Sequence, residues 1–285
     1  MNKTKIETFD ASWNPVTGCR HDCEYCYARS MARRFGGSCL SQKATYFENT
    51  ASDPRGRILR ETRFTKEQAD KVFLKKELDV PLGNPQNGKI DPYPFGFEPT
   101  LHRYRLDEPQ KWKEPRTIFV GSMCDLFGSW VPTSWIKDVF DACAAAPQHR
   151  YLFLTKNPGR YQDLDEMALL PRYENFWYGA SITDKVSAQR ASDAIGSLTP
   201  SVNAFASIEP LHESITDNYE RTYFDWLIIG AETGNRKDKI IPQRGWVEDI
   251  VDAARWELVP IFMKSSLGVI WGEPLIQEFP WEVEK

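Results

Sequence analysis

The sequence predicts an α/β protein whose parallel sheet closes into a partial or complete (βα) barrel. Short runs of β-branched and aromatic residues, bounded by turn or cap residues, recur along the chain as buried strands do. Segments with a helical spacing of apolar residues lie between these runs. Strand and helix therefore alternate about every 25 to 35 residues, which is typical of repeated βα units around a parallel sheet.

Seven strands are expected, the first near residues 8–13. The other six are residues 117–121 (TIFVG), 150–155 (RYLFLT), 176–182 (FWYGASI), 202–208 (VNAFASI), 226–230 (WLIIG) and 259–263 (VPIFM). Helical spacing predicts helices over residues 133–146, 185–198 and 246–256. Asn157 followed by Pro158, and Thr183 followed by Asp184, are typical helix starts.

Residues 47–97 interrupt this alternation. Residues 55–76 hold eight Lys or Arg and three acidic side chains, and closely spaced Pro and Gly residues follow. We expect an inserted basic helix and a Pro/Gly-rich loop here. No long linker divides the second half of the chain, so the rest is predicted to be a single domain over residues 1–285.

Composition limits the class of protein. Of the 285 residues, 41% are hydrophobic, which is enough for a large packed core and argues against disorder. The net charge of −4 argues against binding nucleic acid over the whole surface, although a local basic patch remains compatible with it. No apolar segment resembles a secretion signal or a membrane span, so we expect a cytoplasmic protein without a membrane partner.

Three of the six cysteines form a cluster, Cys19, Cys23 and Cys26, with C-x3-C-x2-C spacing. Thiolates held on so short a loop favour an iron–sulfur cluster or zinc. Three ligands leave one iron of a 4Fe–4S cluster open, whereas a structural zinc site needs four. His21 is the alternative fourth ligand for zinc, but it lies between two of the cysteines, where closure on the same ion is awkward.

The segment GCRHDCEYCYAR, residues 18–29, resembles the hallmark motif of the radical S-adenosylmethionine superfamily, with Tyr25 as its aromatic residue. The chain also resembles a widespread phage-associated family of uncharacterised proteins. That resemblance is carried by the segments SWNPVTGC, GFEPTLHRYRLDEP, TIFVGSMCDLF, AAAPQHRYLFLTKNP, SIEPL and DWLIIGAETG. It extends from about the start of the chain to Lys264 and covers nearly the whole chain except the basic insert.

The resemblance implies a barrel of the radical S-adenosylmethionine type, with a 4Fe–4S cluster on the three cysteines and S-adenosylmethionine as second cofactor. In that superfamily the open iron binds the amino and carboxylate groups of the cofactor. An electron from an external reductant, such as a flavodoxin or ferredoxin-like protein, then breaks a carbon–sulfur bond. The resulting 5′-deoxyadenosyl radical abstracts hydrogen from the substrate. A phage-encoded chain would act in the host cytoplasm.

Polar residues at the ends of the predicted strands complete the site, because catalytic groups of (βα) barrels sit at the carboxyl ends of strands. Strand order in the superfamily implies that Ser122 and Asp125 grip the methionine amine and that Ser181 contacts the ribose. Thr183 is expected chiefly as a helix cap. Glu209 directly follows an apolar strand, which capping explains poorly. The cofactor-binding candidates are Tyr25, Ser122, Asp125, Ser181, Thr183 and Glu209.

The catalytic candidates are Cys124, Lys156 and Glu232. Cys124 would relay a hydrogen atom, as a cysteine does in spore photoproduct lyase, which the layout resembles; the alternative is a small buried side chain. Lys156 would steady a carboxylate or phosphate, or else pair with a strand-end glutamate. Glu232 lies among small residues that let a ligand approach the backbone. His102, His149 and His212 have no companions at ligand spacing and are expected to be structural.

The phage resemblance suggests DNA as substrate, and we expect hydrogen abstraction from an amino-acid-modified thymine followed by rearrangement, an isomerase activity. Arg29, Arg33 and Arg34 after the cysteine motif would form a basic rim for phosphates, or a charged solvated helix face. One alternative is a radical enzyme that acts on a small metabolite or peptide. Another is a non-catalytic iron–sulfur or zinc module that serves a partner protein.

Overall fold

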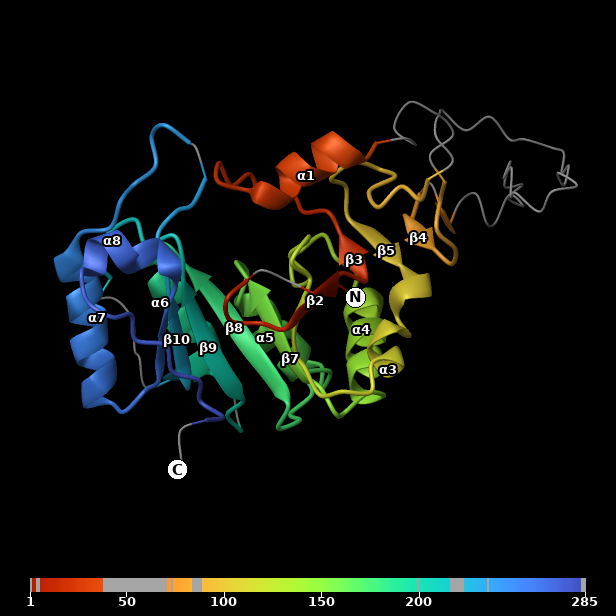
Figure 1. Ribbon diagram of the computed structural model, residues 1–285. Coiled ribbons are helices and arrows are strands. Elements are labelled where there is room, and N and C mark those ends of the chain that lie inside the picture. The colour runs from red at the N-terminus through yellow and green to blue at the C-terminus, as the bar shows by residue number, and fades with distance from the viewer. Residues whose placement is uncertain are drawn as a thin grey trace, which may run out of the picture.

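The computed structural model describes residues 2–3, 6–37, 71–72, 74–83, 89–198, 200–215, 223–234 and 236–282. Its main sheet has eight strands in the order β1-β2-β6-β7-β8-β9-β10-β11 (Figure 1). Their bounds are Asn2–Lys3, Ala11–Trp13, Thr117–Val120, Arg150–Thr155, Phe176–Ile182, Asn203–Ile208, Trp226–Ile229 and Ile261–Met263. The short β1 is antiparallel to β2, and the other neighbours are all parallel.

From β6 to β11, each strand pairs with the next one along the chain, so the order never reverses. Connections of one hand then place every crossover helix on the same side of the sheet. The four helices α4 (Thr133–Ala144), α5 (Gly159–Glu166), α6 (Lys185–Gly196) and α7 (Arg244–Trp256) do contribute to one common core cluster. The fold is therefore a partial (βα) barrel, as the sequence predicts.

Two apolar layers cover the two faces of this sheet. The outer core holds alternate strand residues such as Tyr151, Tyr178 and Leu227 against the helices. The inner face carries the intervening residues, including Leu152, Trp177 and the other members of a mainly aromatic cluster: Phe205, Trp226, Ile228 and Phe262. Complete burial of side chains this large contributes roughly 1.5–3 kcal/mol each. Both faces of the strands are thus apolar, which explains why the strands appear in the sequence as continuous apolar runs.

A second, three-stranded sheet lies beside the main one and consists of β3 (Val16–Thr17), β5 (Thr100–His102) and β4 (Glu77–Leu78). The Glu77 carboxylate accepts hydrogen bonds from Trp135 Nε1 at 2.9 Å and from Arg103 at 3.0 Å, so it ties this sheet to α4. The remaining elements are short. They are α1 (Tyr27–Phe35), η1 (Arg103–Arg105), α3 (Glu108–Lys111), η3 (Ser265–Leu267) and α8 (Gly268–Trp271).

Of the two predicted helix starts, the structure has one as expected and the other at a later residue. Asp184 is the N-cap of α6 and forms a reciprocal capping box with Ser187, as expected. The helix predicted at Asn157 begins later: Pro158 is the N-cap of α5, and no side chain caps it. The Asn157 amide instead donates to the Phe127 carbonyl oxygen at 2.9 Å, so this side chain joins the end of β7 to the segment after β6.

Most of the predicted basic helix lies outside the described residues, as does Cys39. β4 belongs to the region predicted as an insertion, and there it pairs with β5. None of the described helices has both the length and the apolar composition that a membrane span requires.

The buried side chain of His102, in the second sheet, makes the free energy of unfolding depend on pH. Its side chain is fully buried, with Nε2 2.8 Å from Thr17 Oγ1 and Nδ1 3.2 Å from Tyr104 Oη. Burial, and then the positive charge of Arg105, lower the pKa of His102 well below its usual value. Below a pH of about 6.5 the unfolded chain therefore binds a proton that the folded chain refuses, and folding becomes less favourable.

As the pH falls from about 6.5 to 5.5, we expect the free energy of unfolding of the native chain to fall by about 1 kcal/mol more than that of the His102→Gln variant. The glutamine does not titrate, so the difference between the two proteins isolates this residue. Urea denaturation at several pH values measures it. A difference that stays constant over this range would show that His102 titrates normally in the folded chain.

Candidate metal and cofactor site

The cysteine loop, residues 19–26, lies between β3 and α1 at the carboxyl-terminal edge of the main sheet (Figure 1). Its entry is fixed by backbone hydrogen bonds from Gly18 N to the Met123 carbonyl at 2.9 Å and from Cys19 N to the Phe97 carbonyl at 3.1 Å. Gly18 has a φ of +89°, and a Cβ there would lie 2.2 Å from the Glu98 carbonyl oxygen. Only glycine fits this entry.

Three free, half-buried thiols project from the loop, those of Cys19, Cys23 and Cys26. Cys26 is the N-cap of α1, and its Sγ accepts the Arg29 backbone N–H at 3.4 Å. Burial raises the pKa of Cys19 to about 12, and the neighbouring charges, including those of the other two thiols, add to the effect.

The three thiols thus share one neighbourhood and offer the soft donors that iron–sulfur clusters and zinc prefer. Across the part of the chain that the structure describes, no three His, Cys, Asp or Glu side chains are already grouped as metal ligands. The donor set fits a three-cysteine cluster, and closure of the thiols on the metal would accompany its binding.

The contacts of the His21 side chain disfavour its role as a zinc ligand. Its Nε2 lies 2.9 Å from Asp125 Oδ2, and its ring meets the Trp130 ring edge-on at 4.8 Å between centroids. The Arg29 guanidinium also donates to the His21 carbonyl oxygen. The side chain therefore anchors the cysteine loop to the segment after β6, which disfavours the four-ligand zinc site.

Asp125 joins three segments. Besides His21, its buried carboxylate accepts hydrogen bonds from Thr155 Oγ1 at 2.7 Å, Lys156 N at 2.9 Å and Phe127 N at 3.1 Å. Both oxygens are thus engaged by donors from the cysteine loop and from the ends of β6 and β7. Its predicted contact with the methionine amine stays a prediction.

Lys156 lies on the inner side of the sheet, at the end of β7. Its Nζ donates to Tyr25 Oη and to Ser181 Oγ, both at 2.9 Å, and lies 5.2 Å from the centroid of the Tyr25 ring. Burial opposes its charge, but the tyrosine and nearby acidic groups outweigh burial and raise the pKa of Lys156. Among the described residues no carboxylate forms an ion pair with this ammonium, so the predicted alternative, a strand-end glutamate partner, is absent there.

The inner face changes from aromatic to polar toward this edge. Ser181 on β8 pairs in register with Ser207 on β9, on the face that carries the aromatic cluster further down. Glu209, directly after β9, forms an ion pair with Lys264, directly after β11. A layer of hydroxyl and charged groups therefore lies above an apolar floor, close to the cysteine loop.

Glu232, after β10, is bound on both oxygens by Arg236, at 2.8 Å and 2.7 Å. Arg236 also donates to Glu24 Oε2 of the cysteine loop at 2.9 Å. The hydrogen bonds from Arg236 to Glu232, together with the charge of Arg236, lower the pKa of Glu232. Glu232 is therefore a buried, paired carboxylate, and its catalytic role stays a prediction.

Ser122, Thr183 and Cys124 also lie at this edge. Ser122 Oγ donates to Asn14 Oδ1 at 3.2 Å, and Thr183 Oγ1 donates to Asp184 Oδ2 at 2.9 Å within the α6 cap. Cys124 is half-buried and pairs with Gly18 in an isolated parallel bridge. Burial raises the pKa of its thiol well above the usual value. Its thiol is therefore held protonated and beside the start of the cysteine loop.

Two residues that contribute to the site, Asn14 and Arg236, were not predicted from the sequence. Asn14 follows β2 directly and also accepts the Met123 N–H at 2.9 Å; its strand-end position was the available signal. Arg236 has no local signal, since its partner Glu24 is 212 residues away. His212, expected to be structural, packs edge-on against Tyr25 at 5.9 Å, and its buried Nε2 has no hydrogen-bond partner among the described residues.

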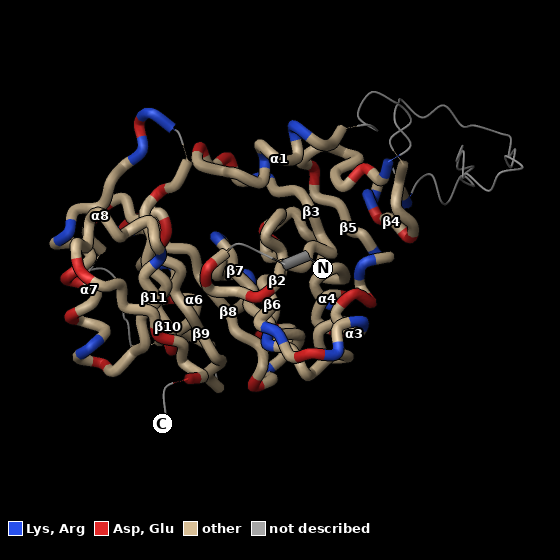
Figure 2. The backbone as a smooth tube through the Cα atoms, in the orientation of Figure 1, with Lys and Arg blue, Asp and Glu red and all other residues tan. Residues whose placement is uncertain are grey.

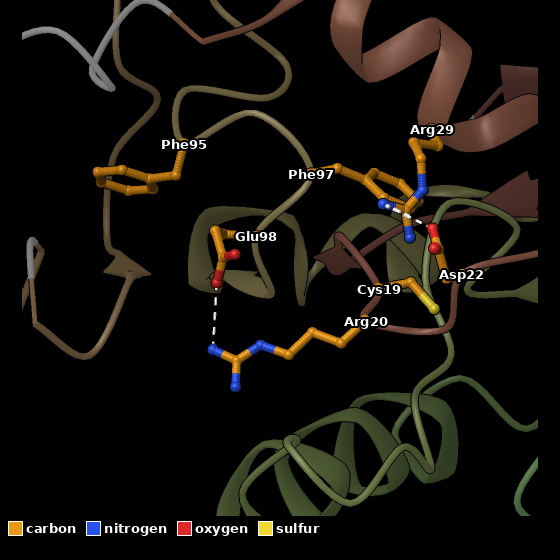
Figure 3. A pocket seen from close by; sticks show the side chains of 7 residues that line it. All are labelled: Cys19, Arg20, Asp22, Arg29, Phe95, Phe97 and Glu98. Carbon is orange, nitrogen blue, oxygen red and sulfur yellow. Dashed lines mark hydrogen bonds and ion pairs between the residues drawn. The ribbon is translucent and has the colours of Figure 1, made fainter.

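An open pocket of about 560 Å³ borders the cysteine loop (Figure 3). It is lined by Cys19, Arg20, Asp22, Arg29, Phe95, Phe97 and Glu98. Figure 3 shows Arg20 reaching Glu98, while Arg29 lies beside Phe97 and pairs with Asp22. The first cysteine of the motif is thus accessible from solvent through a pocket with two arginines.

Fold and site define an α/β protein with a partial (βα) barrel and a three-cysteine loop at the carboxyl edge of its sheet. The chain belongs to the family described as "Protein of unknown function (DUF5131)", which matches residues 3–84 and 84–273. Among solved structures, a mutant of spore photoproduct lyase is similar with a TM-score of 0.47 and 9% identity, over 92% of this chain and 78% of that chain. No curated protein sequence matches the chain.

Asp125→Asn tests the junction between the loop and the strands. The amide loses the charge that four donors share and turns one acceptor into a donor, so we expect a loss of roughly 2–4 kcal/mol of unfolding free energy. Asp141→Asn is the control, because its ion pair with Lys137 is exposed to solvent and contributes little to stability. Urea denaturation of the metal-free proteins compares them. Equal stability of the two variants would mean that Asp125 is no junction.

Proposed function

We propose that the chain is a radical S-adenosylmethionine enzyme in which Cys19, Cys23 and Cys26 bind a 4Fe–4S cluster. One observation carries the proposal: three free, half-buried thiols with C-x3-C-x2-C spacing lie on a loop at the carboxyl edge of a partial (βα) barrel, and Tyr25 of the same loop accepts a hydrogen bond from the ammonium of Lys156. When bound, cluster and cofactor together supply hydrogen abstraction from an unactivated carbon after one-electron reduction. The protein orients the reactants and excludes water.

Lys156 and its two partners suit the polar end of the cofactor. The Lys156 ammonium is half-buried and has no ion pair among the described residues, so it attracts a carboxylate, and Ser181 and Tyr25 already fix its position from two sides. Tyr25 also offers an aromatic face, and the Ser181 hydroxyl can bond a sugar hydroxyl. We therefore assign these three residues to cofactor binding, with Lys156 also available to an anionic substrate.

The other predicted site residues have protein partners at present. Ser122, Asp125 and Thr183 would contact the cofactor in addition to the hydrogen bonds described above, and Glu209 would do so beside Lys264. Cys124 has a protonated thiol near the loop, as a hydrogen-atom donor requires. Glu232 would act through the charge of its buried carboxylate while it stays paired with Arg236.

Replacing Cys19, Cys23 or Cys26 by alanine is expected to abolish cluster loading, because two thiolates cannot hold the cube. After anaerobic reconstitution, iron, sulfide and 5′-deoxyadenosine formation with dithionite and S-adenosylmethionine should fall at least tenfold. Cys143→Ala, in the outer core, should keep all three. Cys124→Ala should keep the iron, since it is not proposed as a ligand.

Unchanged iron and cofactor cleavage in any of the three loop variants would refute the proposal. Zinc without iron or sulfide in anaerobically purified protein would instead support the non-catalytic metal module. Loss of iron in Cys124→Ala would make this thiol a fourth ligand and leave no open iron.

The finer proposal is rearrangement of an amino-acid-modified thymine in DNA, with electrons from a flavodoxin or ferredoxin-like protein. Basic side chains at the end of α1 and in the loop after β10 support a phosphate-bearing substrate: Arg33, Arg34, Lys237 and Lys239 (Figure 2). Arg20 and Arg29 in the open pocket beside Cys19 would suit an acidic electron donor.

We expect turnover of DNA that carries such a thymine by the reconstituted enzyme, detected by mass spectrometry of the released nucleosides. Unmodified DNA is the control. Failure on every thymine-derived DNA, with turnover of a free amino acid or peptide, would replace this substrate with the small-molecule alternative.

A further inference from the structure

Arg236 bridges two elements that are far apart in the sequence. Through one edge of its guanidinium it holds both oxygens of Glu232, whose side chain is 2% exposed, and through NH1 it reaches Glu24 at 2.9 Å. Glu24 lies between the second cysteine of the motif and Tyr25. Figure 1 shows the segment after β10 rising to meet the cysteine loop at the start of α1.

The two halves of this bridge differ in strength. The bond to Glu232 is bidentate, charge-assisted and largely shielded from water, so it fixes the guanidinium. The Glu24 side chain is 79% exposed, and a single contact of this kind is weak in water. The guanidinium is therefore anchored on the barrel side, while the free end of its fork restrains the loop.

We propose that Arg236 is a positioning residue for the cluster: it holds the Cys23–Cys26 part of the cysteine loop over the edge of the barrel. The Asp125–His21 contact secures the first part of the loop from the other side. Two contacts act on the stretch that carries the last two thiols: Lys156 holds the Tyr25 hydroxyl on the inner side of the sheet, and Arg236 holds Glu24 from the segment after β10. The inference deepens the proposed function, on which its consequence for the cluster rests.

The chain offers a matched control. Arg244, on α7, also bridges a glutamate four residues on and a distant one, Glu248 at 2.7 Å and Glu273 at 2.9 Å. It touches no residue of the site. Arg244→Gln therefore removes the same kind of bridge without touching the cysteine loop.

Hydrogen exchange of the metal-free protein measures the restraint directly. Arg236→Gln and Glu24→Gln should each raise the exchange of the amides in residues 20–26 by about two- to fivefold, as expected for loss of an exposed ion pair. Arg244→Gln should leave these amides unchanged. Because the two variants remove the same contact, their effects on exchange should not add in the double variant.

Glu24→Gln separates positioning from general stability, since it leaves the Glu232–Arg236 pair intact. Its urea midpoint should equal that of the native chain, while its reconstituted cluster loses iron to a chelator about two- to fivefold faster. The KM for S-adenosylmethionine should rise more than kcat falls. Arg236→Lys keeps the positive charge but lacks the forked guanidinium. It should therefore fold as the native chain does, while the amides of residues 20–26 still exchange faster than in the native chain.

The inference would be overturned if the amides of residues 20–26 exchanged no faster in Arg236→Gln and in Glu24→Gln than in Arg244→Gln. This holds even if Arg236→Gln proved unstable. Failure of the native chain to take up a cluster would refute the proposed function. It would leave the exchange result on metal-free protein to decide the role of Arg236.

Discussion

The Asp125 carboxylate is the constraint on which the site depends. It is buried, and four donors from three segments share its two oxygens. A buried charge without such donors would be too costly to keep, so the partners must come together for the chain to fold. The ends of β6 and β7 are thereby joined to His21, and the cysteine loop is held against the edge of the barrel.

Below that edge, the inner face of the sheet is divided into two zones. Its floor is aromatic and apolar, with Phe205 and Trp226 among its members, and this floor excludes water. Its upper zone, toward the carboxyl edge, carries Ser181, Ser207 and Lys156. Strand pleat produces this division, since every second residue of β7, β8 and β9 faces inward and these inward residues change from apolar to polar toward the carboxyl end.

The cysteine loop is held by several side-chain contacts and is otherwise free of regular structure. His21 secures its first part, while Lys156 holds Tyr25 and Arg236 holds Glu24 in its last part. Such contacts suit a metal site whose thiols are not grouped in advance among the described residues. They restrict the loop to a small region, so that less conformational entropy is lost when a cluster binds.

Local pattern alone determined the seven parallel strands of the main sheet, most helices and the three-thiol motif, because apolar periodicity and short ligand spacing are properties of neighbouring residues. The short β1 and the second sheet, β3-β5-β4, were not predicted. The same reasoning found the Asp184 cap but not the role of Asn157, whose partner Phe127 is 30 residues away. Only the tertiary structure decided how the strand-end residues are used. Contacts such as Arg236–Glu24 arise when the sheet brings distant segments to one edge, and no local pattern encodes that meeting.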